Sequence, residues 1–291
     1  MNGISLELLP PLTVVPQIDY EEIVADIVDK AHLENASPAD PAFRVALAGA
    51  YRELLIRQQA NEQAQGLTLA YAVGPQLDHI GVTYYRTPNG LPVERLAGES
   101  DDDYKARLQE SPEGMSVAGP EGAYRFHARS ASALVAGVDV DSPTPCVIVL
   151  TVLSREGPAE GQSDYSGPLD GVASPALLAT VAAGVDPVRP LGDRVTYQSA
   201  EIVYYQIEAV IIVDRDLDPE MVMAEAQARA DDYVATAWRL GGLIVRSAVD
   251  AALTAPGVEE VILPDDWVDT RCARHQAPRC NGLVLTLGGS V

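Results

Sequence analysis

Three side chains that bind soft metals lie close together near the end of the sequence. Cys272, His275 and Cys280 fall within nine residues. A structural zinc site is tetrahedral and needs four ligands, so Asp269 would have to supply the fourth. The spacing matches no standard zinc knuckle, and Cys280 is also explained as a small apolar residue at the start of a strand. Zinc binding is therefore an alternative and not the main prediction.

An acidic run further up the chain resembles a calcium-binding loop. Asp214, Asp216 and Asp218 stand at the first, third and fifth places, and Glu225 stands at the twelfth. The sixth place holds Pro219, where the sharp turn of such a loop requires glycine. An N-cap aspartate followed by proline at the first helical position explains Asp218 and Pro219 without a metal. Calcium binding is the second alternative.

The sequence lacks the signatures of common catalytic sites. It has no Gly-x-Ser-x-Gly elbow, no phosphate loop ending in Gly-Lys-Ser/Thr and no His-Glu-x-x-His. Its four histidines, His32, His79, His127 and His275, fall in separate predicted elements. We therefore expect no enzyme, no cofactor and no metal, with a metal-dependent enzyme or a calcium- or zinc-binding module as the alternative.

The charge of the chain excludes two classes of partner. Forty-two acidic residues against twenty basic ones leave a net charge of −22 over 291 residues. Phosphate backbones and anionic lipid headgroups repel such a chain, so we expect neither a nucleic acid nor a membrane surface as partner. Three cysteines fit a reducing cytoplasm better than a secreted disulfide framework, and no run reaches the roughly 18 apolar residues of a membrane span.

The first long element that the sequence predicts is a helix in the N-terminal part of the chain. Asp40 as N-cap and Pro41 at the first helical position begin it, and no further proline occurs before Gly74-Pro75. Some thirty residues at 1.5 Å each span about 45 Å, which exceeds the diameter of a small domain. Spacings of four and three alternate along the helix, as in the seam of a coiled coil. The seam residues are Phe43, Leu47, Ala50, Leu54, Arg57 and Asn61.

We predict that the seam residues bind helices of other chains. The second half of the seam is polar, with Arg57 and Asn61, and an asparagine in a seam fixes register and partner number while lowering stability. The alternative is an amphipathic helix that packs on its own domain.

The predicted fold is α+β, with long N-terminal helices followed by two small mixed α+β modules. The predicted segments are an N-terminal helical bundle segment (1–75), a helical connecting region (76–135), a first module (136–200) and a second module (201–291). Predicted strands span 138–140, 146–153, 194–197, 202–213, 258–263 and 283–287. A faint repeat of a helix–strand–strand unit, in which Cys280 corresponds to Cys146, supports two modules.

Five strings of the sequence carry a resemblance to a known family. They are Arg57-x-x-x-Asn61-Glu62 with Leu69 to Gly81, Gly98 to Leu108, Pro112 to Ala128, Val140 to Gly157, and Val188 to Leu191. Together they resemble the baseplate assembly protein J family of contractile-tailed bacteriophages, which is similar to the larger inner-wedge protein of T-even phage baseplates. The chain departs from the family pattern at Cys146, where glycine is expected, at Tyr84-Tyr85-Arg86, and in an insertion at about 160–171.

The resemblance implies a structural role in the tail baseplate. It implies a wedge component that forms the inner ring between hub and sheath, transmits the contraction signal, and is assembled in the host cytoplasm into the virion tail. The implied partners are a second copy of the chain, a smaller wedge protein bound through a helical bundle, neighbouring wedges in a sixfold ring, and the sheath-initiating baseplate protein.

Overall fold

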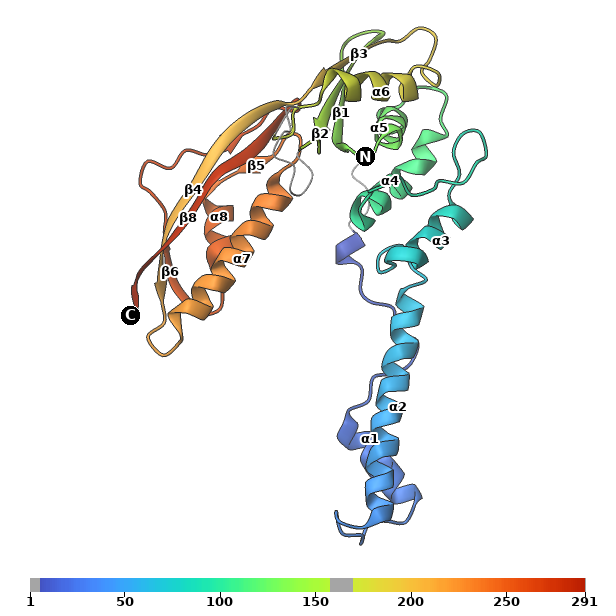
Figure 1. Cartoon of the computed structure of the whole chain (residues 1–291), viewed down its shortest axis with the longest axis vertical. Coiled ribbons are helices and arrows are strands. Elements are labelled where there is room, and N and C mark those ends of the chain that lie inside the picture. Colours follow the sequence, from blue (N-terminus) through green and yellow to red (C-terminus); the bar gives the residue numbers. More distant parts are fainter. Residues whose placement is uncertain (1–5, 158–169, 291) are drawn as a thin grey trace. The chain divides into compact units, whose positions relative to one another are not determined.

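The computed structural model describes residues 6–157 and 170–290, and Figure 1 shows its elements coloured along the sequence. The chain divides into two compact units. Unit 1 comprises Met1–Arg95 and Ser100–Pro112, and unit 2 comprises Leu96–Glu99 and Glu113–Val291. Helices come first and small sheets follow, so the predicted α+β class is confirmed. The four predicted segments are finer than this division, and their boundaries stay a prediction.

Unit 1 is helical. Its elements are the 3-10 turn η1 (Leu6–Leu8), α1 (Tyr20–Lys30), α2 (Pro41–Gln65), α3 (Gly74–Tyr84) and most of α4 (Asp101–Gly114). The long helix begins where predicted, at Pro41, and the Asp40 carboxylate caps it by accepting a hydrogen bond from Ala42 N at 2.8 Å. α2 nevertheless ends well before Gly74, and its 25 residues span about 38 Å. The end falls at Gly66, where a Cβ atom would lie 2.8 Å from Cδ of Gln76.

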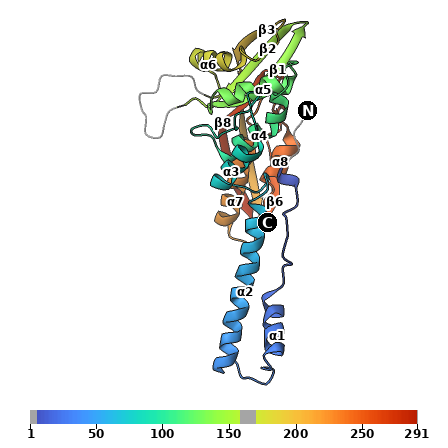
Figure 2. The same cartoon turned by 90° about the vertical axis from the view of Figure 1, so that its right-hand side faces the viewer.

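α1 and the extended segment that precedes it run alongside α2 (Figures 1 and 2). Ile23 on α1 is buried, and Ile27 lies near Gly49 of α2. The Tyr20 hydroxyl donates a hydrogen bond to the carbonyl oxygen of Leu47 at 3.3 Å. The N-terminal part of unit 1 is thus a helix pair with an extended third segment.

The first sheet of unit 2 has the strand order β1-β2-β3. Its strands are β1 (Val135–Thr144), β2 (Val147–Ser154) and β3 (Arg194–Ser199), with β1 antiparallel and β3 parallel to β2. The helices α5 (Glu121–Ala131) and α6 (Pro175–Val185) pack with them. The Ser174 hydroxyl caps α6 by accepting a hydrogen bond from Leu177 N at 3.0 Å.

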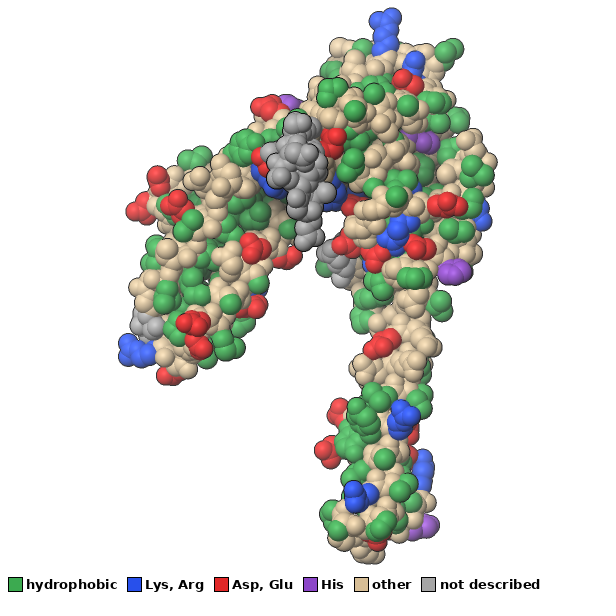
Figure 3. Space-filling view, viewed as in Figure 1, with side chains coloured by type: hydrophobic (Ala, Val, Ile, Leu, Met, Phe, Trp, Pro, Cys, Tyr) green, Lys and Arg blue, Asp and Glu red, His purple; other side chains and the backbone are tan. Residues whose placement is uncertain are grey.

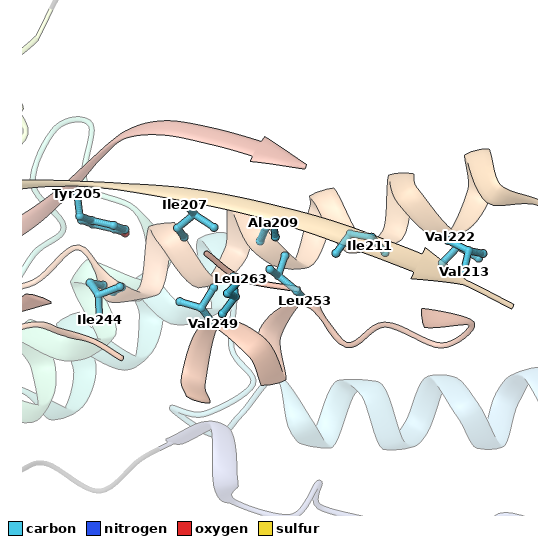
Figure 4. Packing of buried hydrophobic residues seen from close by; sticks show 12 residues of the cluster. Tyr205, Ile207, Ala209, Ile211, Val213, Val222, Ile244, Val249, Leu253 and Leu263 are labelled. Atoms are coloured by element: carbon cyan, nitrogen blue, oxygen red, sulfur yellow. The ribbon is translucent and has the colours of Figure 1, made fainter. Parts of the chain in front are cut away.

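The second sheet of unit 2 has the strand order β6-β4-β8. Its elements are β4 (Glu201–Val213), α7 (Pro219–Ala237), α8 (Arg246–Leu253), β6 (Val258–Ile262) and β8 (Gln276–Ser290), beside a short ladder of β5 (Leu243–Ile244) and β7 (Thr270–Arg271). Alternate residues of β4, from Tyr205 to Val213, point toward α7 and α8 and form the core with Val249 and Leu253 (Figure 4). No helix of the described residues is long and apolar enough to span a bilayer.

Three expectations about unit 2 were wrong. β8 extends far beyond the predicted 283–287, because parallel pairing with β4 holds Pro278 and Gly282 in the strand although neither favours it. Cys280 therefore lies inside β8, and Cys146 is exposed at the turn before β2 with a φ of 62°. The predicted repeat also fails, because β1 and β2 are neighbours whereas β4 separates β6 from β8. The predicted insertion lies outside the described residues except for Asp170 and Gly171.

Candidate interaction surfaces

The six predicted seam residues lie on one face of α2, and in the single chain that face is turned toward the chain's own N-terminal segment. Ala50 and Asn61 are buried, and Phe43, Leu47, Leu54 and Arg57 are half-buried. α1 contacts the first half of α2, and the extended segment before α1 contacts the second half. The structure contains no second chain, so the binding of other helices by these residues stays a prediction.

Asn61 holds the extended segment through its side-chain amide. Its Oδ1 atom accepts hydrogen bonds from Val14 N at 3.0 Å and Val15 N at 2.9 Å. Its Nδ2 atom donates to the carbonyl oxygen of Val15 at 2.9 Å. A buried amide needs such partners, since an unsatisfied one costs about 1–3 kcal/mol. In a coiled coil, a seam asparagine fixes the alignment of two helices. Here Asn61 instead fixes the alignment of α2 with residues 14–15 of the same chain.

Arg57 extends the same contact by one turn. Its Nη2 atom binds Glu53 Oε1 at 2.6 Å, and its Nη1 atom donates to the carbonyl oxygen of Pro16 at 3.4 Å. Near the end of α2, Gln65 Nε2 donates to the carbonyl oxygen of Leu12 at 3.4 Å. The polar half of the seam therefore binds backbone N–H and carbonyl groups of the extended segment.

The opposite face of α2 exposes large apolar side chains, which the seam pattern does not predict. We define this outer face by Val45, Tyr51, Leu55 and Ile56. Val45 is 72% exposed and Ile56 is 64% exposed. Hydrophobic atoms are visible at the surface along this helix in Figure 3. The signal for this face in the sequence is weak, because the series Val45, Ala48, Arg52, Leu55 and Gln59 contains two polar residues and omits Tyr51 and Ile56.

A buried tyrosine organises the rest of unit 1 and brings the first two family-like strings together. Tyr104 is fully buried, and its hydroxyl donates to the carbonyl oxygen of Val93 at 2.6 Å. The Arg95 guanidinium lies 4.8 Å from the centre of the Tyr104 ring and binds Asp78 and Asp101, each at 2.6 Å. A hydrogen bond from Gly74 N, followed by the contact with Arg95, lowers the pKa of Asp101 below its usual value. The strings around residues 74–78 and 101–104 are thus explained by packing.

The third and fifth family-like strings meet in unit 2. Gly119 has a φ of 72°, and a Cβ atom there would lie 2.6 Å from Cγ of Pro190. The Tyr124 hydroxyl donates to Asp193 Oδ2 at 2.6 Å, and burial followed by this contact raises the pKa of Tyr124. Leu191, beside this junction, is fully exposed at the tip of its loop.

The zinc candidates do not form a ligand cluster in the described part of the chain, where no three His, Cys, Asp or Glu side chains are placed to hold a metal. Asp269 accepts hydrogen bonds from Arg246 N at 3.1 Å and Trp267 Nε1 at 3.2 Å. The bond from Arg246 is the main cause of the lowered pKa of Asp269. Burial raises the pKa of the Cys272 thiol, which disfavours the thiolate that zinc requires. Asp269, His275 and Cys280 have structural partners, since His275 Nε2 lies 3.4 Å from Glu201 and the Cys280 thiol lies 3.3 Å from the carbonyl oxygen of Gly282.

The calcium candidate is a turn and a helix start. The Asp214 carboxylate accepts a hydrogen bond from Asp216 N at 2.9 Å. The Asp218 carboxylate accepts one from Glu220 N at 3.0 Å, and Pro219 begins α7. These bonds account for both carboxylates as backbone caps.

Comparison with known proteins gives two matching family models and one full-length relative. The model described as Baseplate J-like N-terminal domain matches residues 39–88, and that described as Baseplate J-like protein C-terminal domain matches residues 205–286. The first match includes α2 and α3, and the second includes most of β4 and most of β8. Baseplate protein J of Escherichia phage P2 is 38% identical over 314 residues, which cover 100% of this chain and 99% of that protein.

A solved structure, the cryo-EM structure of the anti-feeding prophage baseplate after sixfold symmetrisation, is 18% identical with a TM-score of 0.42. That match covers 65% of this chain and 44% of the other, so the chain spans less than half the length of its structural neighbour. A TM-score of this size is too low to support an inference about fold. The phage P2 protein, in contrast, matches along its whole length, and the chain therefore belongs to the baseplate J family of contractile-tailed bacteriophages.

Proposed function

We propose that the chain, a structural component of a phage tail baseplate, is a wedge protein of the inner ring that links hub and sheath and transmits the contraction signal. Its proposed partners are a second copy of itself, a smaller wedge protein, neighbouring wedges in a sixfold ring and the sheath-initiating baseplate protein. A ring closed by sixfold rotation needs heterologous contacts, in which two different patches of each subunit meet.

One observation supports the proposed contact with the smaller wedge protein. α2 exposes apolar side chains on the side away from the seam, and the chain's own N-terminal segment covers only the face that contains the seam residues. The outer face leaves Val45 and Ile56 mostly in solvent. A surface helix of a lone domain is apolar on one face and polar on the other, whereas a helix that is apolar on both sides belongs in a larger bundle. We therefore propose that the outer face binds a helix of the smaller wedge protein.

The test compares two pairs of substitutions in the same helix. One variant carries Val45→Asp and Ile56→Asp on the outer face, and the other carries Leu47→Asp and Leu54→Asp in the seam. Each is co-expressed as the full chain with the smaller wedge protein and purified through a tag on the partner. We expect the outer-face variant to lose the partner because two buried carboxylates would be left unpaired in the bundle. We expect limited proteolysis to show its N-terminal segment still bound to α2.

The seam variant separates the two faces. It should release the chain's own N-terminal segment, which would become sensitive to protease. If instead the seam variant alone loses the partner and the outer-face variant keeps it, the partner binds the seam residues directly and the outer-face assignment is wrong. If both variants keep the partner, the wedge protein does not bind through α2.

A further inference from the structure

β8 is a long strand at the edge of its sheet. It pairs with β4 on one side, and its first residues are also covered on the other side, where Gly241 N donates to the carbonyl oxygen of Gln276 at 2.8 Å. From Asn281 to Gly289, no backbone hydrogen bond from the other described segments reaches that second side. This free edge presents a row of unpaired N–H and C=O groups, which can pair with a strand of another chain.

The free edge of β8 lacks the features that protect the edges of β1 and β6, and it is longer than the remaining edge strand, β3, which has six residues. On β1, the Arg125 and Arg274 guanidinium groups bind the carbonyl oxygens of Val138 and Val140 at 3.4 and 3.0 Å. β6 is only five residues long and carries Glu259 and Glu260. β8 has no charged residue between Asn281 and Gly289. Proteins block edges with charges and short strands, so an unblocked edge of this length is suited to pairing.

The sequence of the free edge indicates which strand it pairs with. Gly282-Leu283-Val284-Leu285-Thr286-Leu287-Gly288 has nearly the same pattern in both directions about Leu285. In an antiparallel pair of two such strands centred on Leu285, Leu283 lies opposite Leu287 and Val284 lies opposite Thr286. Leucines then meet on one face of the sheet and two β-branched residues of similar size, valine and threonine, meet on the other, which gives the self-complementarity that a twofold contact requires.

The side-chain positions in the monomer fit this pairing. Leu283 and Leu285 pack against the core on the helix-covered face, whereas Leu287 on the same face is 50% exposed. Val284 is on the opposite face and is 52% exposed. The register with β4 is uninterrupted from Gly282 to Leu287. The strand is therefore regular over the five residues Leu283 to Leu287 at the centre of the symmetric pattern, and the pairing with β4 is interrupted at Gly288.

We propose that the free edge of β8 pairs antiparallel with the same edge of a second copy of this chain, about a twofold axis at Leu285. The two three-stranded sheets would then form one continuous sheet. The occupant is a second copy because of the symmetric sequence, and because an uncharged strand lets two chains of net charge −22 meet without placing like charges opposite each other. This inference rests on the proposed function in one respect, namely that two copies of the chain are present together in the assembly.

The test uses two charge variants that differ in one residue. In V284K/T286K, each introduced lysine would lie opposite a lysine of the second copy. In V284K/T286E, each lysine would lie opposite a glutamate. Both substituted positions are on the strand face away from the helices, so the monomer can accommodate them. Sedimentation equilibrium of the purified full chain should show a dimer for the unchanged protein and for V284K/T286E, with self-association weakened about tenfold or more in V284K/T286K.

A control and two contrary results complete the experiment. Leu191→Lys places a lysine at another exposed leucine and should leave the dimer unchanged. A monomeric unchanged protein, or equal weakening of both variants with unchanged circular dichroism, would overturn the inference. Co-purification with the smaller wedge protein is measured on the same variants. Because the helical contact is in unit 1, its loss alone would count against the proposed function and not against the β8 pairing.

Discussion

Cys146 has a backbone conformation that favours glycine, at the position where the family pattern led us to expect glycine. Its φ of 62° lies in the left-handed region, which costs an L-residue about 1–2 kcal/mol. Glycine avoids this cost but loses about 0.5–1 kcal/mol through the entropy of the unfolded chain. We expect Cys146→Gly to raise the free energy of unfolding by roughly 0.5 kcal/mol, measured by urea denaturation. Cys272→Gly is the control and should lower it. Equal losses in both variants would contradict the explanation.

His127 makes the stability of unit 2 sensitive to mild acid. Burial lowers its pKa below the usual value of 6.5, and the hydrogen bond between Nε2 and the carbonyl oxygen of Gly114, 3.1 Å long, only partly opposes this. The folded state therefore favours the neutral ring, whereas the unfolded chain takes up a proton near pH 6.5. The stabilisation is complete above that pH and is lost as the pH falls below it.

The His127→Gln variant isolates this effect. Glutamine keeps a donor for the carbonyl oxygen of Gly114 and does not titrate. Between pH 7 and pH 5, the melting temperature of the unchanged protein should fall more than that of the variant, because all other titrating groups are shared. Parallel curves over this range would show that His127 titrates alike in both states.

At the scale of elements, two helix glycines of unit 1 have opposite surroundings. A Cβ atom on Gly81 of α3 would overlap the Tyr104 hydroxyl, and Tyr104 cannot move because it is fully buried and bound to Val93. A Cβ atom on Gly49 of α2 would meet only Cδ1 of Ile27, at 3.9 Å. We expect Gly81→Ala to destabilise unit 1 by about 1–3 kcal/mol and Gly49→Ala to stabilise it by about 0.5–1 kcal/mol.

Thermal denaturation followed by helical circular dichroism measures both changes. Each variant is the control for the other, since both replace a helix glycine by alanine. If both raised the melting temperature, helix propensity would dominate and the close approach of Tyr104 to α3 would not be a constraint.

Helix starts were predictable from the sequence because local chemistry sets them. The carboxylates of Asp40 and Asp218, which the sequence predicts as N-caps, each accept a backbone hydrogen bond at the start of a helix. Helix ends and strand lengths depend on partners far away in the chain. α2 ends where Gln76 packs on Gly66, and no periodic pattern records that contact.

The seam face of α2 and the edge of β8 also show that a sequence pattern does not predict its tertiary partner. The seam pattern found one face of α2 but not its occupant, because an extended segment held by Asn61 has no periodicity of its own. For β8, Pro278 and Gly282 weaken the strand signal, and pairing with β4 outweighs it. What sequence reasoning missed was therefore tertiary and was decided by residues remote from the pattern.

At the scale of the whole molecule, the proposed role in transmitting a contraction signal would require the two modules of unit 2 to move together. The first and second modules share a small apolar cluster around Leu153, Ala200 and Ala277. Arg274 adds a polar contact between them, because its guanidinium binds Asp139 at 2.9 Å and the carbonyl oxygen of Val140 at 3.0 Å. Asp139 is only 14% exposed, so this contact is partly shielded from solvent.

The last prediction concerns the joint between the two modules. Arg274→Ala removes the polar contact but leaves the apolar cluster in place. The loss of stability should be small, at most about 1 kcal/mol, because the guanidinium is itself more than half exposed. Cooperativity should change more than stability. Calorimetry should show a broader transition for the variant, and hydrogen exchange should become faster in β1 near Val140.

Arg271→Ala is the control, since Arg271 binds Asp269 inside the second module. If both variants kept the original transition width and exchange rates, the apolar cluster alone would couple the modules, and Arg274 would have no part in transmitting motion between them.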